Sequence, residues 1–116
     1  MVKEFSGRSV IVMGGSRGIG RSIALGFAAA GASVSICARS EGPLEATRRE
    51  IAALGVKAHA ASVDLADADA IAAYVPAAVE SLGGLNVLVN NASGFGHADD
   101  EEGWAASLSI DMMAVV

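Results

Sequence analysis

Glycines near the N-terminus occur at a spacing that suits the binding of a phosphate. Segment 13–20 reads Met-Gly-Gly-Ser-Arg-Gly-Ile-Gly, and it lies between an apolar run at 9–12 and an alanine-rich stretch at 21–30. This order predicts a strand, a glycine turn and a helix. At such a junction backbone N–H groups and the positive end of a helix dipole point to one place, where an anion binds. The sequence therefore predicts that the turn holds the phosphates of a nucleotide.

The spacing of these glycines admits three interpretations. Gly14, Gly18 and Gly20 give G-x-x-x-G-x-G, which departs from the G-x-G-x-x-G pattern of a dinucleotide-binding turn. Residues 15–22 approach the P-loop pattern G-x-x-x-x-G-K-[ST], but Arg21 stands where that loop needs a lysine. The third interpretation is a turn whose glycines serve only close packing. We favour a dinucleotide site, because an arginine does not replace the compact charge of the P-loop lysine.

The glycine turn must be positioned by the elements around it, and the sequence predicts strands and helices in alternation. The strands are apolar throughout, which implies a parallel sheet covered by helices on both faces. Right-handed crossover connections then favour the strand order 3-2-1-4. The predicted fold class is therefore α/β, a Rossmann-like doubly wound parallel sheet with four strands. Strands are predicted at 8–13, 33–38, 56–63 and 85–90, and helices at 18–30, 41–54 and 67–82.

Single residues mark the ends of these helices. Ser40 precedes the second helix and is expected to cap it with its side chain. Glycines end the three helices, at Gly31, Gly55 and 83–84. Pro76 falls inside the third helix, where its missing N–H is expected to kink the helix or split it in two.

The last stretch of the sequence predicts a helix that has no end signal. Acidic residues at 99–102 complement the dipole of a helix start, and neither glycine nor proline occurs at 104–116. We therefore expect one domain over residues 1–116, truncated within the helix that follows the fourth strand. The fourth strand would then have an open edge, which favours self-association into a homo-oligomer.

The composition is that of a single domain with a large core, since 53% of its residues are hydrophobic and 18% are charged. The net charge of −5 argues against nucleic acid as a partner, and no apolar run reaches the ~18 residues that span a bilayer. Cys37 is the only cysteine, which favours a cytoplasmic location and a place in the core. His59 and His97 have no partners at ligand spacing, so no structural metal is expected.

Three short motifs occur in order at the predicted strand ends. They are Gly14-x-x-x-Gly18-Ile19-Gly20 after the first strand, Asp64-Leu65 after the third, and Asn90-Asn91-Ala92 after the fourth. Together they resemble the short-chain dehydrogenase/reductase family over almost the whole chain. The resemblance implies that the turn wraps the pyrophosphate of a nicotinamide dinucleotide and that Asp64 binds the adenine amino group. It also implies that Asn91 and Ala92 line the nicotinamide-ribose side.

The residues after the second predicted strand favour NADP(H) over NAD(H). An acid about 20 residues beyond the turn would accept hydrogen bonds from a ribose 2′-hydroxyl and repel a 2′-phosphate. Arg39 stands there instead, and its guanidinium can grip a phosphate while Arg17 approaches from the turn. The alternatives are a solvated surface residue for Arg39 and a helix N-cap for Asp64. The expected cofactor-binding residues are Gly14, Ser16, Arg17, Gly18, Ile19, Gly20, Arg39, Asp64, Leu65, Asn91 and Ala92.

The residues that would complete catalysis in the resembled family are only partly present. The resemblance implies a tyrosine as proton donor with a lysine four residues later, but Tyr74 is the only tyrosine and Ala78 takes that place. Tyr74 falls in the third predicted helix, where we expect a packing or a surface role rather than a catalytic one. Asp111 stands where the family usually carries a water-binding Asn after an aromatic residue such as Trp104, so it is the catalytic candidate. Some relatives that reduce unsaturated acyl-CoA thioesters have Asp at this point.

The resemblance predicts an NADP(H)-dependent oxidoreductase that transfers a hydride to or from a carbonyl or alcohol group of a small molecule. Because Tyr-x-x-x-Lys is absent, the 116 residues alone are expected to be inactive. Two alternatives stay open: a nucleotide-binding remnant without turnover, and a parent enzyme that reduces an unsaturated acyl-CoA thioester.

Overall fold

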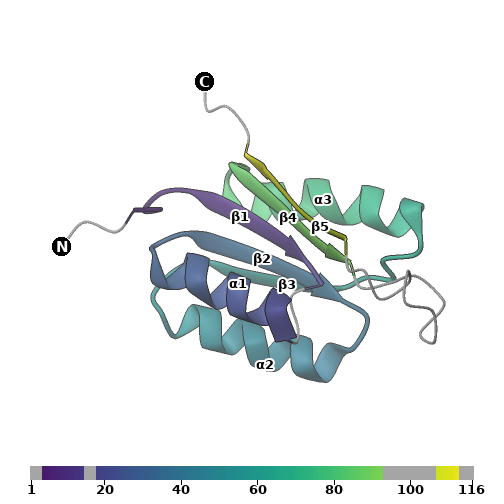
Figure 1. Cartoon of the computed structure of the whole chain (residues 1–116), viewed down its shortest axis with the longest axis horizontal. Coiled ribbons are helices and arrows are strands. Elements are labelled where there is room, and N and C mark those ends of the chain that lie inside the picture. Colours follow the sequence, from purple (N-terminus) through teal and green to yellow (C-terminus); the bar gives the residue numbers. More distant parts are fainter. Residues whose placement is uncertain (1–3, 15–17, 93–106, 113–116) are drawn as a thin grey trace.

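A computed structural model describes residues 4–14, 18–92 and 107–112 of the chain (Figure 1). Strands and helices alternate up to the fourth strand, as the hydrophobic pattern predicts. The elements are β1 (Ser9–Met13), α1 (Gly18–Ala29), β2 (Ser33–Ala38), α2 (Glu41–Ala52), β3 (Ala58–Ser62), α3 (Ala68–Leu82), β4 (Val87–Ala92) and β5 (Ser107–Met112).

Four strands of the sheet are parallel and lie in the order β3-β2-β1-β4. The predicted α/β class and the order 3-2-1-4 are therefore confirmed. β5 adds a fifth strand beside β4 and runs in the opposite direction (Figure 1). β1 lies inside the sheet and is buried along its whole length, which explains why its sequence is apolar rather than alternating.

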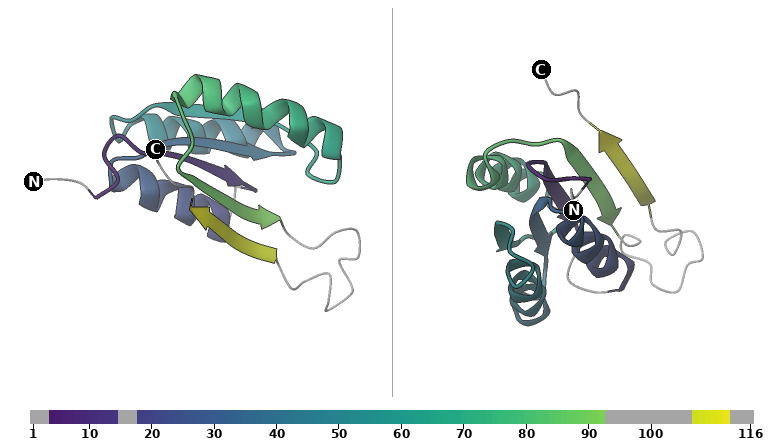
Figure 2. Two further views of the ribbon diagram at one scale, coloured as in Figure 1. Left: turned by 90° about the horizontal axis from the view of Figure 1, so that it is seen from above. Right: turned by 90° about the vertical axis from the view of Figure 1, so that its left-hand side faces the viewer.

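Helices cover both faces of the sheet, with α1 and α2 on one face and α3 on the other (Figure 2). Successive side chains of a strand point to opposite faces, so β1 contributes to two cores. Val10 and Val12 belong to the core under α1 and α2, whereas Ile11 and Met13 belong to the core under α3. Small residues on the buried face of α1 let this helix lie close to the sheet: Gly20, Ala24 and Ala28.

The segment 107–112 is a strand, so the helix predicted after the fourth strand is wrong for these residues. β5 pairs with the whole of β4, from Ser107 opposite Ala92 to Met112 opposite Val87. The prediction that the fourth strand has an open edge is also wrong, since β5 covers that edge. Pairing with β5 gives the backbone groups of β4 hydrogen bonds that an open edge would lack. The expected helix start at 99–102 lies outside the described residues.

Two expectations about the other helices are wrong in part. Ser40 occupies the N-cap position of α2 as predicted, but its side chain makes no capping hydrogen bond. α3 continues unbroken through Pro76, so the proline does not split the helix, and a kink there stays a prediction. Pro76 is exposed, and so is Ala72, whose carbonyl loses its helical N–H partner. Water can satisfy that carbonyl, which explains why the helix tolerates the proline.

A polar cluster lies in the core between β2, β3 and α3. The Ser35 hydroxyl is hydrogen-bonded to the Tyr74 hydroxyl and lies 2.8 Å from His59 Nδ1. Cys37 is fully buried, which confirms its predicted place in the core, and Tyr74 is 4% exposed, which decides for packing over a surface position. Burial raises the pKa of Tyr74, and it raises the pKa of Cys37 to about 11, so both groups stay protonated near neutral pH.

His59 is expected to make the stability of the fold depend on pH. Its ring stacks on Tyr74 with centroids 6.1 Å apart, and partial burial lowers the pKa of His59 below its usual value. The unfolded chain therefore takes up a proton as the pH falls through about 6.5, while the folded chain resists it, so stability is lost below that pH. Urea unfolding of the wild type and of His59→Gln between pH 5 and pH 8 measures the effect. The variant should lose less stability on acidification, and parallel curves would contradict the prediction.

Candidate functional site

The carboxyl ends of the parallel strands bring the predicted cofactor residues to one edge of the sheet. Gly14 follows β1, Arg39 follows β2, Asp64 comes shortly after β3, and Asn91 lies near the end of β4. The strand order changes direction between β1 and β4, and ligands of open α/β sheets bind at such a point. The glycine turn also contacts the neighbouring strand, because the Gly14 N–H donates to the Cys37 carbonyl at 2.8 Å.

Gly20 is tightly enclosed at the start of α1. A Cβ placed on it would lie 2.0 Å from the Gly14 carbonyl oxygen and 2.7 Å from Asn91 Nδ2. Close packing therefore explains Gly20, but it does not explain Gly18, because a Cβ there would meet none of the described residues within 4 Å. Gly18 and Gly14 have φ values of 55° and 86°, a conformation that other residues rarely adopt. The two described glycines that flank 15–17 thus have the backbone conformation that a tight, phosphate-binding turn requires.

Three further predicted residues lie in this turn or at the strand end next to it. Asn91 Nδ2 donates to the Gly14 carbonyl at 3.5 Å, so it links the end of β4 to the turn. Ala92 is the next residue and ends β4. Ile19 lies at the start of α1 and is 66% exposed.

Asp64 shapes the loop between β3 and α3. Its Oδ1 accepts a hydrogen bond from the Ala66 N–H at 3.0 Å, and its carbonyl accepts one from the Asp67 N–H at 2.9 Å. The N-cap of α3 is Asp67, so the alternative that Asp64 caps the helix is wrong. The Asp64 side chain is exposed, whereas Leu65 is half-buried against the core under α3. Asp64 is therefore exposed to solvent at the edge of the sheet where the parallel strands end, and Leu65 contributes to the core next to it.

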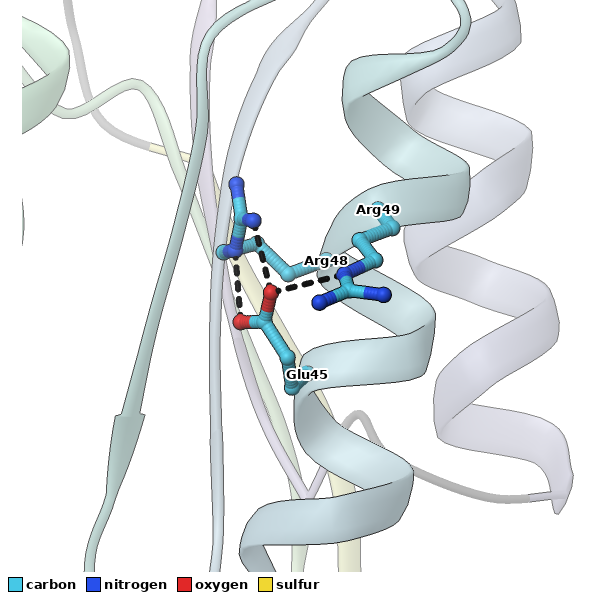
Figure 3. Close-up of polar contacts among 3 residues, drawn as sticks. All are labelled: Glu45, Arg48 and Arg49. Atoms are coloured by element: carbon cyan, nitrogen blue, oxygen red, sulfur yellow. Dashed lines mark hydrogen bonds and ion pairs between the residues drawn. The ribbon is translucent and has the colours of Figure 1, made fainter.

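Arg39 differs from the other arginines near it. Glu45 accepts hydrogen bonds from Arg48 at 2.7 Å and from Arg49 at 3.1 Å (Figure 3), and the hydrogen bond from Arg48 lowers the pKa of Glu45 to about 2. Arg21 pairs with Glu50 in the same way. The exposed Arg39 guanidinium has no acidic partner within 4–14, 18–92 and 107–112. It is thus a cation at the end of β2 that is available to an anionic ligand.

Ser62 is a residue that the sequence analysis missed. It ends β3, opposite Ala38, and its hydroxyl donates to the backbone carbonyl of Arg39 at 3.0 Å. A single serine at a strand end carries no recognisable pattern, so no sequence signal could have singled it out.

Four of the residues singled out in the sequence are not described by the structure, and a fifth lies away from this edge. Ser16 and Arg17 lie outside the described residues, as do His97 and Trp104. Asp111 stands opposite Leu88 in the sheet, near the start of β4. Four residues of strand separate that position from the end of β4, which is about 13 Å. The strand geometry therefore gives no support to a catalytic role for Asp111, which stays a prediction.

The described part of the chain contains no group of three or more His, Cys, Asp or Glu residues that could hold a metal ion. None of its helices is both long and apolar enough to cross a membrane.

The sequence profile described as "short chain dehydrogenase" matches residues 8–116. The chain belongs to the short-chain dehydrogenase family. This agrees with the glycine turn, the Asp64 loop and the Asn91 strand end, which lie at the same edge of the sheet. The resemblance drawn from the three motifs is confirmed.

Characterised relatives of this short-chain dehydrogenase chain have several substrates. It is 44% identical over 92 residues to L-rhamnose 1-dehydrogenase (NAD(P)(+)) from a Sphingomonas species, covering 78% of the chain and 36% of that protein. It is 46% identical over 86 residues to the 3-oxoacyl-[acyl-carrier-protein] reductase FabG of Staphylococcus aureus, covering 73% of the chain and 35% of that protein. The chain thus spans about a third of the length of these relatives.

Solved structures of short-chain dehydrogenases have the same fold. A short chain dehydrogenase from Burkholderia cenocepacia in complex with NADP superposes with a TM-score of 0.75 at 43% identity, over 83% of this chain and 40% of that one. A putative short-chain alcohol dehydrogenase from Sinorhizobium meliloti gives a TM-score of 0.74 at 42% identity, over 90% of this chain and 43% of that one.

Proposed function

We propose that this chain is the cofactor-binding part of an NADP(H)-dependent oxidoreductase. The glycine turn would hold the pyrophosphate, and Asp64 would receive the adenine amino group. Asn91 and Ala92 would lie beside the nicotinamide ribose. The described ends of the turn fit such a group, because a Cβ at Gly18 would meet no described residue within 4 Å and Gly14 and Gly18 hold the backbone in a left-handed conformation. Bound NADPH would supply the hydride.

The observation that carries the choice of NADP(H) is the exposed Arg39 guanidinium at the end of β2, which has no acidic partner among the described residues. No acid occupies positions 38–40, so no carboxylate there would accept a ribose 2′-hydroxyl or repel a 2′-phosphate. Arg17 in the turn is proposed to approach the same phosphate. Two similar solved structures, 43% and 41% identical to this chain, are described as complexes with NADP.

Isothermal titration calorimetry of the folded chain with NADPH and NADH tests this proposal. We expect NADPH to bind at least about tenfold more tightly, since a hydrogen bond to a charged group contributes about 1.5–3 kcal/mol. Absence of any heat with millimolar NADPH would refute the proposal, and equal affinities would refute the cofactor choice.

The proposed reaction is hydride transfer to or from a carbonyl or alcohol group of a small molecule. The 116 residues contain one tyrosine, Tyr74. Its hydroxyl is buried and hydrogen-bonded to Ser35, so it does not face the edge of the sheet where Gly14 and Arg39 follow their strands. We therefore propose that the chain alone binds NADP(H) without turnover. An NADPH oxidation assay with ketone, aldehyde and enoyl substrates should detect none.

We also propose that the chain forms a homo-oligomer. Within the described ranges β5 pairs with β4 alone, so its outer edge presents backbone groups that a second copy could pair with. Size-exclusion chromatography should give a mass above that of the 11.6 kDa monomer at micromolar concentration. A monomer at all concentrations would contradict this.

A further inference from the structure

The end of β2 is held by a series of hydrogen bonds from its neighbours. The Gly14 N–H binds the Cys37 carbonyl at 2.8 Å, and the Val63 N–H binds the Ala38 carbonyl at 2.9 Å. Arg39 is the next residue, and it lies beyond the last backbone pair of the β2–β3 ladder. Its carbonyl is bound by a side chain, the hydroxyl of Ser62. The backbone at Arg39 is thus held on both sides, by the Val63 N–H on the preceding peptide and by the Ser62 hydroxyl on the following one.

The chain that follows Arg39 adds one backbone restraint. Ser40 sits at the N-cap position of α2 with φ −92° and ψ 113°; its carbonyl accepts a hydrogen bond from the Leu44 N–H at 3.2 Å, and its side chain makes no capping hydrogen bond. The Arg39 side chain is exposed and has no acidic partner among the described residues. The backbone therefore sets the point from which this side chain leaves the strand end, and no ion pair among the described residues holds the guanidinium.

We propose that Ser62 is a positioning residue that sets the preference for NADPH over NADH by holding the Arg39 backbone through its hydroxyl. The inference rests on the proposed binding of NADP(H). A guanidinium binds a phosphate best when its fork is already aligned, because less freedom is then lost on binding. Loss of the Ser62 hydroxyl frees the Arg39 peptide and weakens the contact with the 2′-phosphate, which NADH lacks.

The test compares the ratio of NADPH to NADH affinity in variants of the whole chain. We expect Ser62→Ala to lower this ratio about three- to tenfold, which corresponds to the loss of one exposed hydrogen bond. The affinity for NADH should not change. Ser62→Thr keeps the hydroxyl and should retain the ratio, whereas the similarly shaped Ser62→Val should lower it. These two β-branched variants suit a strand, so they answer the question even if Ser62→Ala folds poorly. Ser81→Ala, an exposed serine on α3, is the matched control.

A second comparison separates a positioning role from a merely structural one. In the Arg39→Ala background, Ser62→Ala should leave the ratio unchanged, because the group through which it acts is gone. An unchanged ratio in Ser62→Ala and Ser62→Val, or an equal loss for both cofactors, would overturn the role of Ser62 while the proposed function stands. A wild-type chain without preference for NADPH would overturn the cofactor choice and this inference together.

Discussion

Replacement of Gly20 by alanine is expected to weaken cofactor binding strongly and to destabilise the fold. The added Cβ would lie 2.0 Å from the Gly14 carbonyl oxygen and 2.7 Å from Asn91 Nδ2, so the turn or the end of β4 must move by about 1 Å or more. Such overpacking costs about 1–3 kcal/mol. Because the same movement displaces the amide groups of the turn, we expect the affinity for NADPH to fall about a hundredfold.

Gly26→Ala is the matched control for this change. Gly26 lies on the same helix, α1, and a Cβ added there meets nothing within 4 Å. Alanine in an exposed helix interior is more favourable than glycine by about 0.5–1 kcal/mol. Thermal unfolding and calorimetry should therefore show a more stable protein with unchanged affinity. Wild-type affinity in Gly20→Ala would contradict the geometry of the turn.

The parts of the fold that the sequence predicts are those with a strong local signal. Continuous apolar runs such as 9–13 predict that the strands are parallel, because such a run is buried on both sides when helices cover both faces of the sheet. The glycine turn is also local, since left-handed backbone at Gly14 and Gly18 demands glycine. Because the parallel strands all end at the same edge of the sheet, the residues that follow them lie together at that edge.

The remaining features depend on partners that are distant in the sequence. Segment 107–112 alternates apolar and polar residues, which is a weak signal for a strand. The acidic residues before it are typical of a helix start and favour a helix instead. The hydrogen bond from Ser62 to Arg39 spans 23 positions, and that from Ser35 to Tyr74 spans 39. Neither bond has a pattern that a single sequence reveals, because serine occupies many environments.

Replacement of Arg39 by alanine is expected to remove most of the preference for NADPH. The guanidinium is exposed and has no acidic partner in the described part of the chain, so its loss should leave the fold intact. Each charged hydrogen bond to a phosphate contributes about 1.5–3 kcal/mol, so the affinity for NADPH should fall about ten- to a hundredfold. NADH has no 2′-phosphate, and its affinity should not change.

Two variants sharpen this comparison. Arg39→Lys keeps the charge but loses the planar fork, so its loss of NADPH affinity should lie between those of the wild type and Arg39→Ala. Arg8→Ala removes an equally exposed arginine that precedes β1, at the opposite end of that strand from the turn, and should change neither affinity.

Ionic strength gives an independent measure of the same interaction. A contact between an exposed guanidinium and a phosphate is screened by salt, so the NADPH preference of the wild type should shrink between about 0.05 and 1 M salt. The affinities of Arg39→Ala should show a weaker dependence. Equal losses of NADPH and NADH affinity in Arg39→Ala would mean that Arg39 acts on a part of the cofactor that both share. The basis for choosing NADP(H) at the end of β2 would then be removed, while the pyrophosphate site on the glycine turn would stand.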